Sequence, residues 1–220
     1  MTDIFREIDD EVRRAKAAAV WNRYRNVFAV VAVVAVAGVG GWQFWQHQER
    51  QTASGLGSRF ESALRASSDG NATEAEAMLT ELAGAGKGGY ARLARFRLAA
   101  EVGKRDAAAG AAAFEALAAD TTLDQAYRDL ARLRAGLLRV DIAPYAELKT
   151  TLEPLTTGTN SWRHTARELL GISAMKASQY DDAGRWFDAI VTDPQAPQAL
   201  RQRVELYLAL VRGGAVETKN

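Results

Sequence analysis

The stretch WRHTARELLGISAMKASQYDDAGRWFDAIVTDP, residues 162–194, decides the fold. Its apolar residues recur every three or four positions on both sides of a short polar break, which is typical of two helices joined by a tight turn. Small residues let two helices approach closely, and a large ring fills the space between one pair and the next. The residues that would pack the pair follow in this order along the stretch: Leu170, Gly171, Ala183, Phe187 and Pro194.

Weaker copies of this pattern precede it. Gly136 stands near the position of Gly171, one period earlier. Going back along the chain, the positions of Ala183 and Phe187 are taken by Leu148 and Leu152, Gly110 and Phe114, and Ala75 and Leu79. The pattern resembles the tetratricopeptide repeat, which stacks because one pair cannot bury its apolar face alone. We therefore expect an all-α, right-handed solenoid of about four helix pairs plus a C-terminal capping helix.

Local signals set the expected helix ends. Thr73 with Glu76 and Thr122 with Gln125 match the capping-box pattern, and Asp106 is a candidate N-cap. With the turn residues between them, these signals predict helices over residues 56–68, 73–84, 89–103, 106–119, 123–140, 144–156, 161–178, 181–192 and 195–212.

An uncharged run near the N-terminus predicts a membrane helix. Its apolar part, residues 27–45, begins with Val27 and ends with Trp45. At about 1.5 Å per residue, 19 residues span roughly 28 Å, close to the thickness of the hydrocarbon layer. The alternative is a cleaved signal peptide, whose apolar region is usually shorter and lies behind a shorter leader.

The charges around this run predict its orientation. The preceding segment carries the excess of basic residues, namely Arg13, Arg14, Lys16, Arg23 and Arg25, so the N-terminus should stay in the cytoplasm. We expect a single-pass protein of the inner membrane with a cytoplasmic amphipathic segment (1–25), a transmembrane helix (26–46), a linker (47–58) and a periplasmic tetratricopeptide-repeat-like domain (59–220).

Composition and motifs argue against several classes of function. The chain has no cysteine, two histidines, and 28 basic against 27 acidic residues. These numbers speak against thiol chemistry, Cys-ligated metal sites and nucleic acid as a partner. The segment 84–89, GAGKGG, follows a predicted helix instead of a strand, which argues against nucleotide binding. We expect no enzymatic activity, no cofactor, no metal and no small-molecule substrate. His164 is expected at the surface.

Arginine recurs at the period of the repeat. One row runs through Arg59, Arg95, Arg132, Arg167 and Arg203, and a second row runs through Arg92, Arg128 and Arg163. Equivalent positions line up in a solenoid, so the two rows would lie on the first helices of the pairs. Guanidinium groups there could bind the carboxylates of an acidic segment or a chain terminus. The alternative is a solvated helix face.

The whole chain resembles one bacterial family. A short N-terminal segment, one apolar run and a degenerate repeat domain are the architecture of the ancillary SecYEG translocon subunit, and the opening MTDIFREIDDEVRRAKAAAVWNRYR is similar to its alphaproteobacterial members. This resemblance implies work with the Sec translocon, periplasmic chaperones or exported clients. The alternative is a periplasmic repeat scaffold for envelope assembly or cell division, with or without release by cleavage.

Overall fold

A computed structural model of the chain describes residues 3–85 and 88–213, without the side chains of residues 3–20, 22–33 and 49. It divides into two compact units, Met1–Leu56 and Gly57–Asn220. The described residues are mostly helical and contain no strand, as the composition predicts. Alanine, the residue with the highest helix propensity, accounts for 43 of the 220 positions.

The first unit is the N-terminal part of one long helix, α1 (Asp3–Ser68). Where side chains are described, no helix is both long and apolar enough to cross a membrane. Residues 27–33 of the predicted membrane span lie outside the described side chains. The structure therefore leaves the predicted span as an expectation.

The residues of the expected linker, 47–58, are helical and continue α1 without a break. The hydroxyl groups in this segment bond to the helix backbone: Thr52 Oγ1 donates to the carbonyl of Gln48 at 3.0 Å, and Ser54 Oγ donates to that of Gln51 at 3.2 Å. Such bonds to carbonyls of the preceding turn satisfy these side chains inside a helix. Gly55 weakens a helix by only about 1 kcal/mol relative to alanine, which does not end it.

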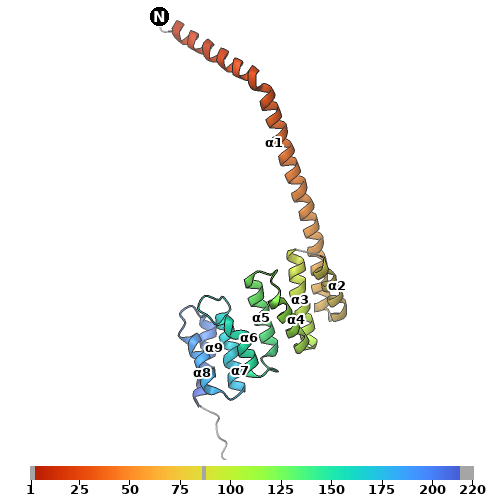
Figure 1. Ribbon diagram of the computed structural model, residues 1–220, viewed down its shortest axis with the longest axis vertical. Helices are drawn as coiled ribbons and strands as arrows, with labels where there is room; N and C mark the ends of the chain where they lie inside the picture. The colour runs from red at the N-terminus through yellow and green to blue at the C-terminus, as the bar shows by residue number, and fades with distance from the viewer. Residues whose placement is uncertain (1–2, 86–87, 214–220) are drawn as a thin grey trace, which may run out of the picture. The chain divides into compact units, whose positions relative to one another are not determined.

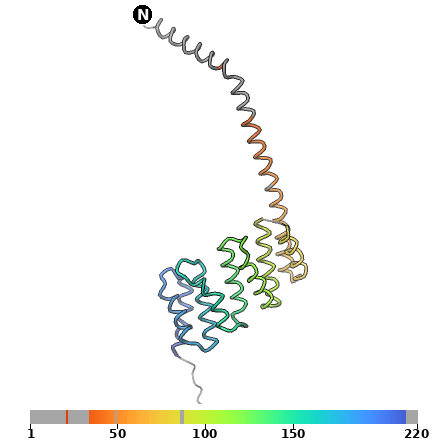
Figure 2. Tube along the Cα trace, in the orientation of Figure 1, coloured from red at the N-terminus to blue at the C-terminus, as the bar shows by residue number. Residues whose placement is uncertain are grey.

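The second unit is an array of antiparallel helix pairs (Figures 1 and 2). The end of α1 pairs with α2 (Ala72–Gly84), and Arg59 of α1 donates a hydrogen bond to Glu81 of α2. The following pairs are α3 (Gly89–Arg105) with α4 (Ala107–Ala119), α5 (Gln125–Arg139) with α6 (Tyr145–Leu152) and the short 3₁₀ turn η1 (Glu153–Leu155), and α7 (Arg163–Lys176) with α8 (Tyr180–Val191). The last helix, α9 (Gln198–Gly213), packs on α8. The predicted four pairs and capping helix are confirmed.

Four of the five residues expected to pack the last pair are buried. Leu170, Ala183 and Phe187 are fully buried. A Cβ atom at Gly171 would lie 2.3 Å from Cε1 of Phe187, so only glycine permits the ring to pack there. Pro194 instead lies exposed in the turn before α9.

The turn around Pro194 also explains why α9 begins at Gln198 and not at residue 195. The Oδ1 atom of Asp193 accepts the backbone N–H of Gln195 at 2.9 Å, and its carbonyl accepts that of Ala196 at 3.0 Å. These bonds form a turn that the sequence pattern did not reveal.

The degenerate copies have the predicted register. Ala75, Leu79, Gly110, Phe114, Leu148 and Leu152 are all buried. A Cβ atom at Gly110 would lie 2.3 Å from Cα of Gly103, so α3 and α4 cross backbone to backbone. Gly136 faces Leu152 as Gly171 faces Phe187. The repeats therefore differ in the size of the packing residues and keep the positions where the helices meet.

The helix ends were predicted less well than the packing. Asp106 caps α4, since its Oδ1 accepts the N–H of Ala109 at 3.0 Å. The capping boxes at Thr73 and Thr122 are wrong. Helix α2 begins at Ala72, one residue before the predicted start, and its N-cap is Asn71. The hydroxyl of Thr122 donates to the carboxylate of Asp120 and does not cap α5.

The buried residues of the array form two clusters. The larger cluster joins α5 to α9 and includes Leu148, Leu170, Phe187 and Val204. The smaller cluster joins α3, α4 and α5 and includes Phe114 and Leu117. Helix α5 contributes residues to both clusters, so it connects the N-terminal core to the C-terminal core.

Candidate functional site

A groove runs across the first helices of the first three pairs, and we call it the first-helix groove. It encloses about 380 Å³ between the end of α1, α3 and α5, with Phe114 of α4 at its base. Its walls are largely apolar, and the large apolar side chains from these first helices are Phe60, Leu64, Leu93, Phe96, Tyr127 and Leu130. Leu93 is 48% exposed, so this apolar surface is open to solvent.

The aromatic rings of the groove are in mutual contact. The ring of Phe96 lies 6.1 Å from that of Phe114 and 6.1 Å from that of Tyr127. Tilted and edge-on contacts at this distance are favourable and hold the rings in fixed positions. The rings therefore support one another and help to shape the wall of the groove.

Three arginines line the groove, and no aspartate or glutamate is among its described lining residues. The guanidinium of Arg92 lies 4.7 Å above the ring of Tyr127. That of Arg97 is held by Glu101 at 2.6 Å and by Ser67 at 3.0 Å. Arg134 is exposed and has no ion pair or hydrogen-bond partner among the described side chains.

The first predicted arginine row is largely paired within the chain. Arg59 meets Glu81 at 2.9 Å, Arg95 meets Asp120 at 2.6 Å, Arg132 meets Asp129 at 3.4 Å, and Arg203 meets Glu168 at 2.7 Å. Arg167 donates to the carbonyls of Ala189 and Thr156, both at 2.9 Å, and lies 3.3 Å from Asp193. Several of these bonds join a first helix to the end of its own second helix, so the row helps to hold the pairs together.

The second row bonds chiefly to the loops that lead to the next pair. Arg92 lies 3.7 Å from Asp124, and Arg163 bonds to Asp193 at 3.0 Å and to Gln195 at 2.7 Å. Arg128 differs, because it bonds to Gln125 in its own helix. The sequence contained a signal for these pairs: Asp124 and Gln195 both stand 32 residues after their arginines.

The strongest charge cluster lies around Asp193, where α7 meets the loop before α9. Its carboxylate accepts hydrogen bonds from Arg163 and from the backbone N–H of Gln195, and its Oδ2 lies 2.9 Å from Nε2 of His164. These bonds, that from Arg163 above all, hold the pKa of Asp193 well below its usual range. The expected surface position of His164 is wrong, because its side chain is buried in this cluster.

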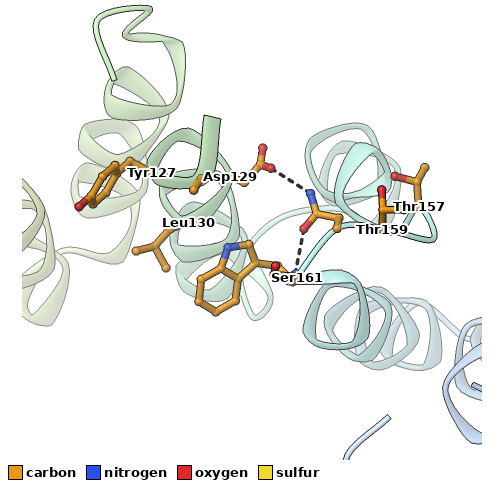
Figure 3. Close-up of a pocket in the computed structure, with 9 residues that line it drawn as sticks. Tyr127, Asp129, Leu130, Thr157, Thr159 and Ser161 are labelled. Atoms are coloured by element: carbon orange, nitrogen blue, oxygen red, sulfur yellow. Dashed lines mark hydrogen bonds between the residues drawn. The ribbon is translucent and has the colours of Figure 1, made fainter. Parts of the chain in front are cut away.

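A second pocket of about 590 Å³ continues from the groove along α5 (Figure 3). Tyr127 and Leu130 line both spaces, and Thr157 and Thr159 stand on the opposite side. The carboxylate of Asp129 is occupied by Gln125 and Asn160 at 2.7 and 2.9 Å. The pocket therefore extends the groove with neutral hydroxyl groups and offers no free charge.

Among the side chains that the structure describes, no group of three or more His, Asp or Glu residues is placed to hold a metal ion. The arrangement of the groove, with fixed apolar walls and cationic edges, is that of a surface that binds other molecules.

Comparison with known protein families agrees with this architecture. Residues 19–210 match the tetratricopeptide repeat-like domain. No curated protein and no solved structure matches the chain. Since the match covers most of the 220 residues, the chain belongs to the tetratricopeptide repeat-like domain family.

Proposed function

We propose that the protein is a membrane-anchored periplasmic scaffold that binds other proteins through the first-helix groove. Helical repeats of this kind serve as surfaces for protein–protein interaction. The observation that carries the proposal is the groove itself, an open apolar surface of three first helices with fixed aromatic rings. Aromatic and arginine side chains are the residues that contribute most to protein interfaces.

The proposed partners are the Sec translocon, periplasmic chaperones and exported clients, so that the protein links export to the chaperones. The resemblance of the N-terminal segment to the ancillary SecYEG translocon subunit supports this choice. The uncharged residues 27–45 and the basic flank before them support an inner-membrane anchor with the N-terminus in the cytoplasm. The arginine rows contribute partner contacts in this proposal where their side chains remain exposed, as at Arg59 and Arg203.

Topology can be tested by fusing alkaline phosphatase, which is active only outside the cytoplasm, after residue 213. An active fusion is expected. A second fusion after residue 20 should be inactive because that segment stays in the cytoplasm. An inactive fusion at residue 213 would rule out a periplasmic scaffold.

Partners can be identified by placing a photo-crosslinking amino acid at Leu93, in the groove, and separately at Leu206, which is 68% exposed on α9. Mass spectrometry of the crosslinked products should find translocon components, chaperones or exported proteins from position 93 and not from position 206. Products that contain only envelope-assembly or division proteins would favour the alternative scaffold. Equal products from both positions would contradict the groove as the binding surface.

A further inference from the structure

We infer that the first-helix groove selects segments in which a carboxylate lies close to a large apolar side chain, and that Arg134 is the residue that binds the carboxylate. The inference rests on the proposed function, because it names the chemistry of the partner that the groove would bind. It differs from the arginine rows predicted above, to which Arg134 does not belong.

Charge is the first argument. The groove has three arginines in its lining and no carboxylate among its described lining residues, so a negatively charged segment is favoured over a positively charged one. Two of the three guanidinium groups already have partners, since Arg97 is bonded to Glu101 and Arg92 is stacked on Tyr127. Arg134 keeps its hydrogen-bond donors available, and a guanidinium can bind a carboxylate through two parallel bonds.

The spacing on α5 is the second argument. Tyr127, Leu130 and Arg134 are three and four residues apart, so they follow one another along one face of the helix. The step from Leu130 to Arg134 is about 6 Å along the axis. An extended chain advances about 3.3 Å per residue, so the carboxylate should stand two positions from the apolar side chain.

The exposed apolar surface is the third argument. Leu93 and the aromatic rings present apolar surface in the groove that Arg134 also lines. Covering such surface is favourable by about 25 cal/mol per Å² of apolar area. A segment that is only acidic would leave this surface in water, so the partner needs both chemical groups.

The test compares two fluorescent peptides of about twelve residues. One repeats Leu-Ser-Asp, and the other has Lys in place of each Asp. In the first peptide each Asp stands two positions after a Leu, which is the spacing inferred above. Binding to the full chain in neutral detergent is followed by fluorescence anisotropy at low salt, where exposed charges are least screened. We expect the Asp peptide to bind at least about tenfold more tightly than the Lys peptide.

The variant Arg134→Glu should remove this preference by weakening the Asp peptide about tenfold or more. Its matched control is Lys149→Glu on α6, which reverses a charge away from the groove and should change binding less than about twofold. Leu93→Ser should weaken both peptides, whereas Leu206→Ser on α9 should weaken neither. Circular dichroism of each variant checks that the helices remain formed.

The outcomes separate the inference from the proposed function. Equal binding of the two peptides, or a preference that survives Arg134→Glu, overturns the inference and leaves the groove as a protein-binding surface. Absence of binding by either peptide also overturns it, while crosslinks from position 93 in cells would still support the scaffold. Binding of the Asp peptide that needs both Arg134 and Leu93 establishes it.

Discussion

Arg95 and Arg167 stand two repeats apart at equivalent positions, and their surroundings differ. Arg95, on α3, is 36% exposed and meets a single carboxylate, that of Asp120. Arg167, on α7, is 14% exposed and bonds to Asp193 and to two backbone carbonyls. Arg92 and Arg163 are also equivalent positions and differ in exposure in the same way: Arg92 lines the groove, whereas Arg163 is buried.

The difference teaches what the last helix does to a repeat. In the C-terminal pair, α9 packs on α8, and the loop before it brings Asp193 and Gln195 to Arg163. In the N-terminal pairs the first helices keep an open side with apolar and cationic side chains. Arginines at equivalent repeat positions are thus buried in a bonded cluster near the C-terminal end of the array and more exposed to solvent near its N-terminal end.

The largest expected effect comes from Phe187→Ala in the fully buried C-terminal core. Replacing a buried phenylalanine by alanine lowers the free energy of unfolding by about 3–5 kcal/mol. Phe114→Ala, at the equivalent position beside the groove, should cost less because water can enter the space from the groove. Urea unfolding followed by circular dichroism measures both. A larger loss for Phe114→Ala would contradict the comparison.

The second effect concerns the two aspartates. Asp193→Asn leaves Arg163 and Arg167 largely buried without a carboxylate, so it should lower the melting temperature more than Asp120→Asn, whose arginine is more exposed. Thermal unfolding at pH 7 measures the difference, and equal losses would show that the two sites are energetically alike.

These aspartates also predict the response to acid. Bonds from Thr122, and then from Arg95, lower the pKa of Asp120 to about 2, and the pKa of Asp193 is also lowered. In the unfolded chain both carboxylates have the ordinary aspartate pKa of about 3.9, so the unfolded chain binds protons more readily than the folded one. Their contribution to the free energy of unfolding is therefore present above about pH 3.9 and is lost as the pH falls toward 2. Asp193→Asn should flatten the decline of the melting temperature over this range, and an unchanged slope would contradict the assignment.

A smaller effect is expected from Gly171→Ala. The new Cβ atom would meet the ring of Phe187, and overpacking of this kind costs about 1–3 kcal/mol. Gly184→Ala on α8 is the control, because its nearest neighbour, a methyl of Val211, would lie 3.8 Å away. That variant should gain up to about 1 kcal/mol from helix propensity. The prediction fails if both substitutions have the same sign.

The packing of the repeats could be predicted because its signals are local and periodic. Gly171 and Phe187 lie in one helical hairpin, and their spacing is enough to place them in contact. The same spacing placed Gly110 and Leu152 in degenerate copies. The helical conformation of residues 47–58 could not be predicted, because Ser and Thr are typical of loops and their bonds to the helix backbone leave no trace in the composition.

For the candidate site, the sequence could predict only which helices carry the arginines. Arginine periodicity placed the rows on the first helices, but the partner of Arg167 lies 26 residues away, in a loop whose turn the sequence did not reveal. His164 was missed for the same reason, since its burial depends on that loop. Arg134 lies outside both rows, and only the arrangement of α3 and α5 shows that it lines the groove.

The two core clusters have a consequence for how the array opens. In a linear repeat protein, neighbouring units can unfold locally without the rest. The groove lies on the smaller cluster, so the amide hydrogens of α3 and α4 should exchange with solvent before those of α7 and α8. A ligand that joins α1, α3 and α5 would slow that exchange, so occupancy of the groove can be followed through the motion of the backbone.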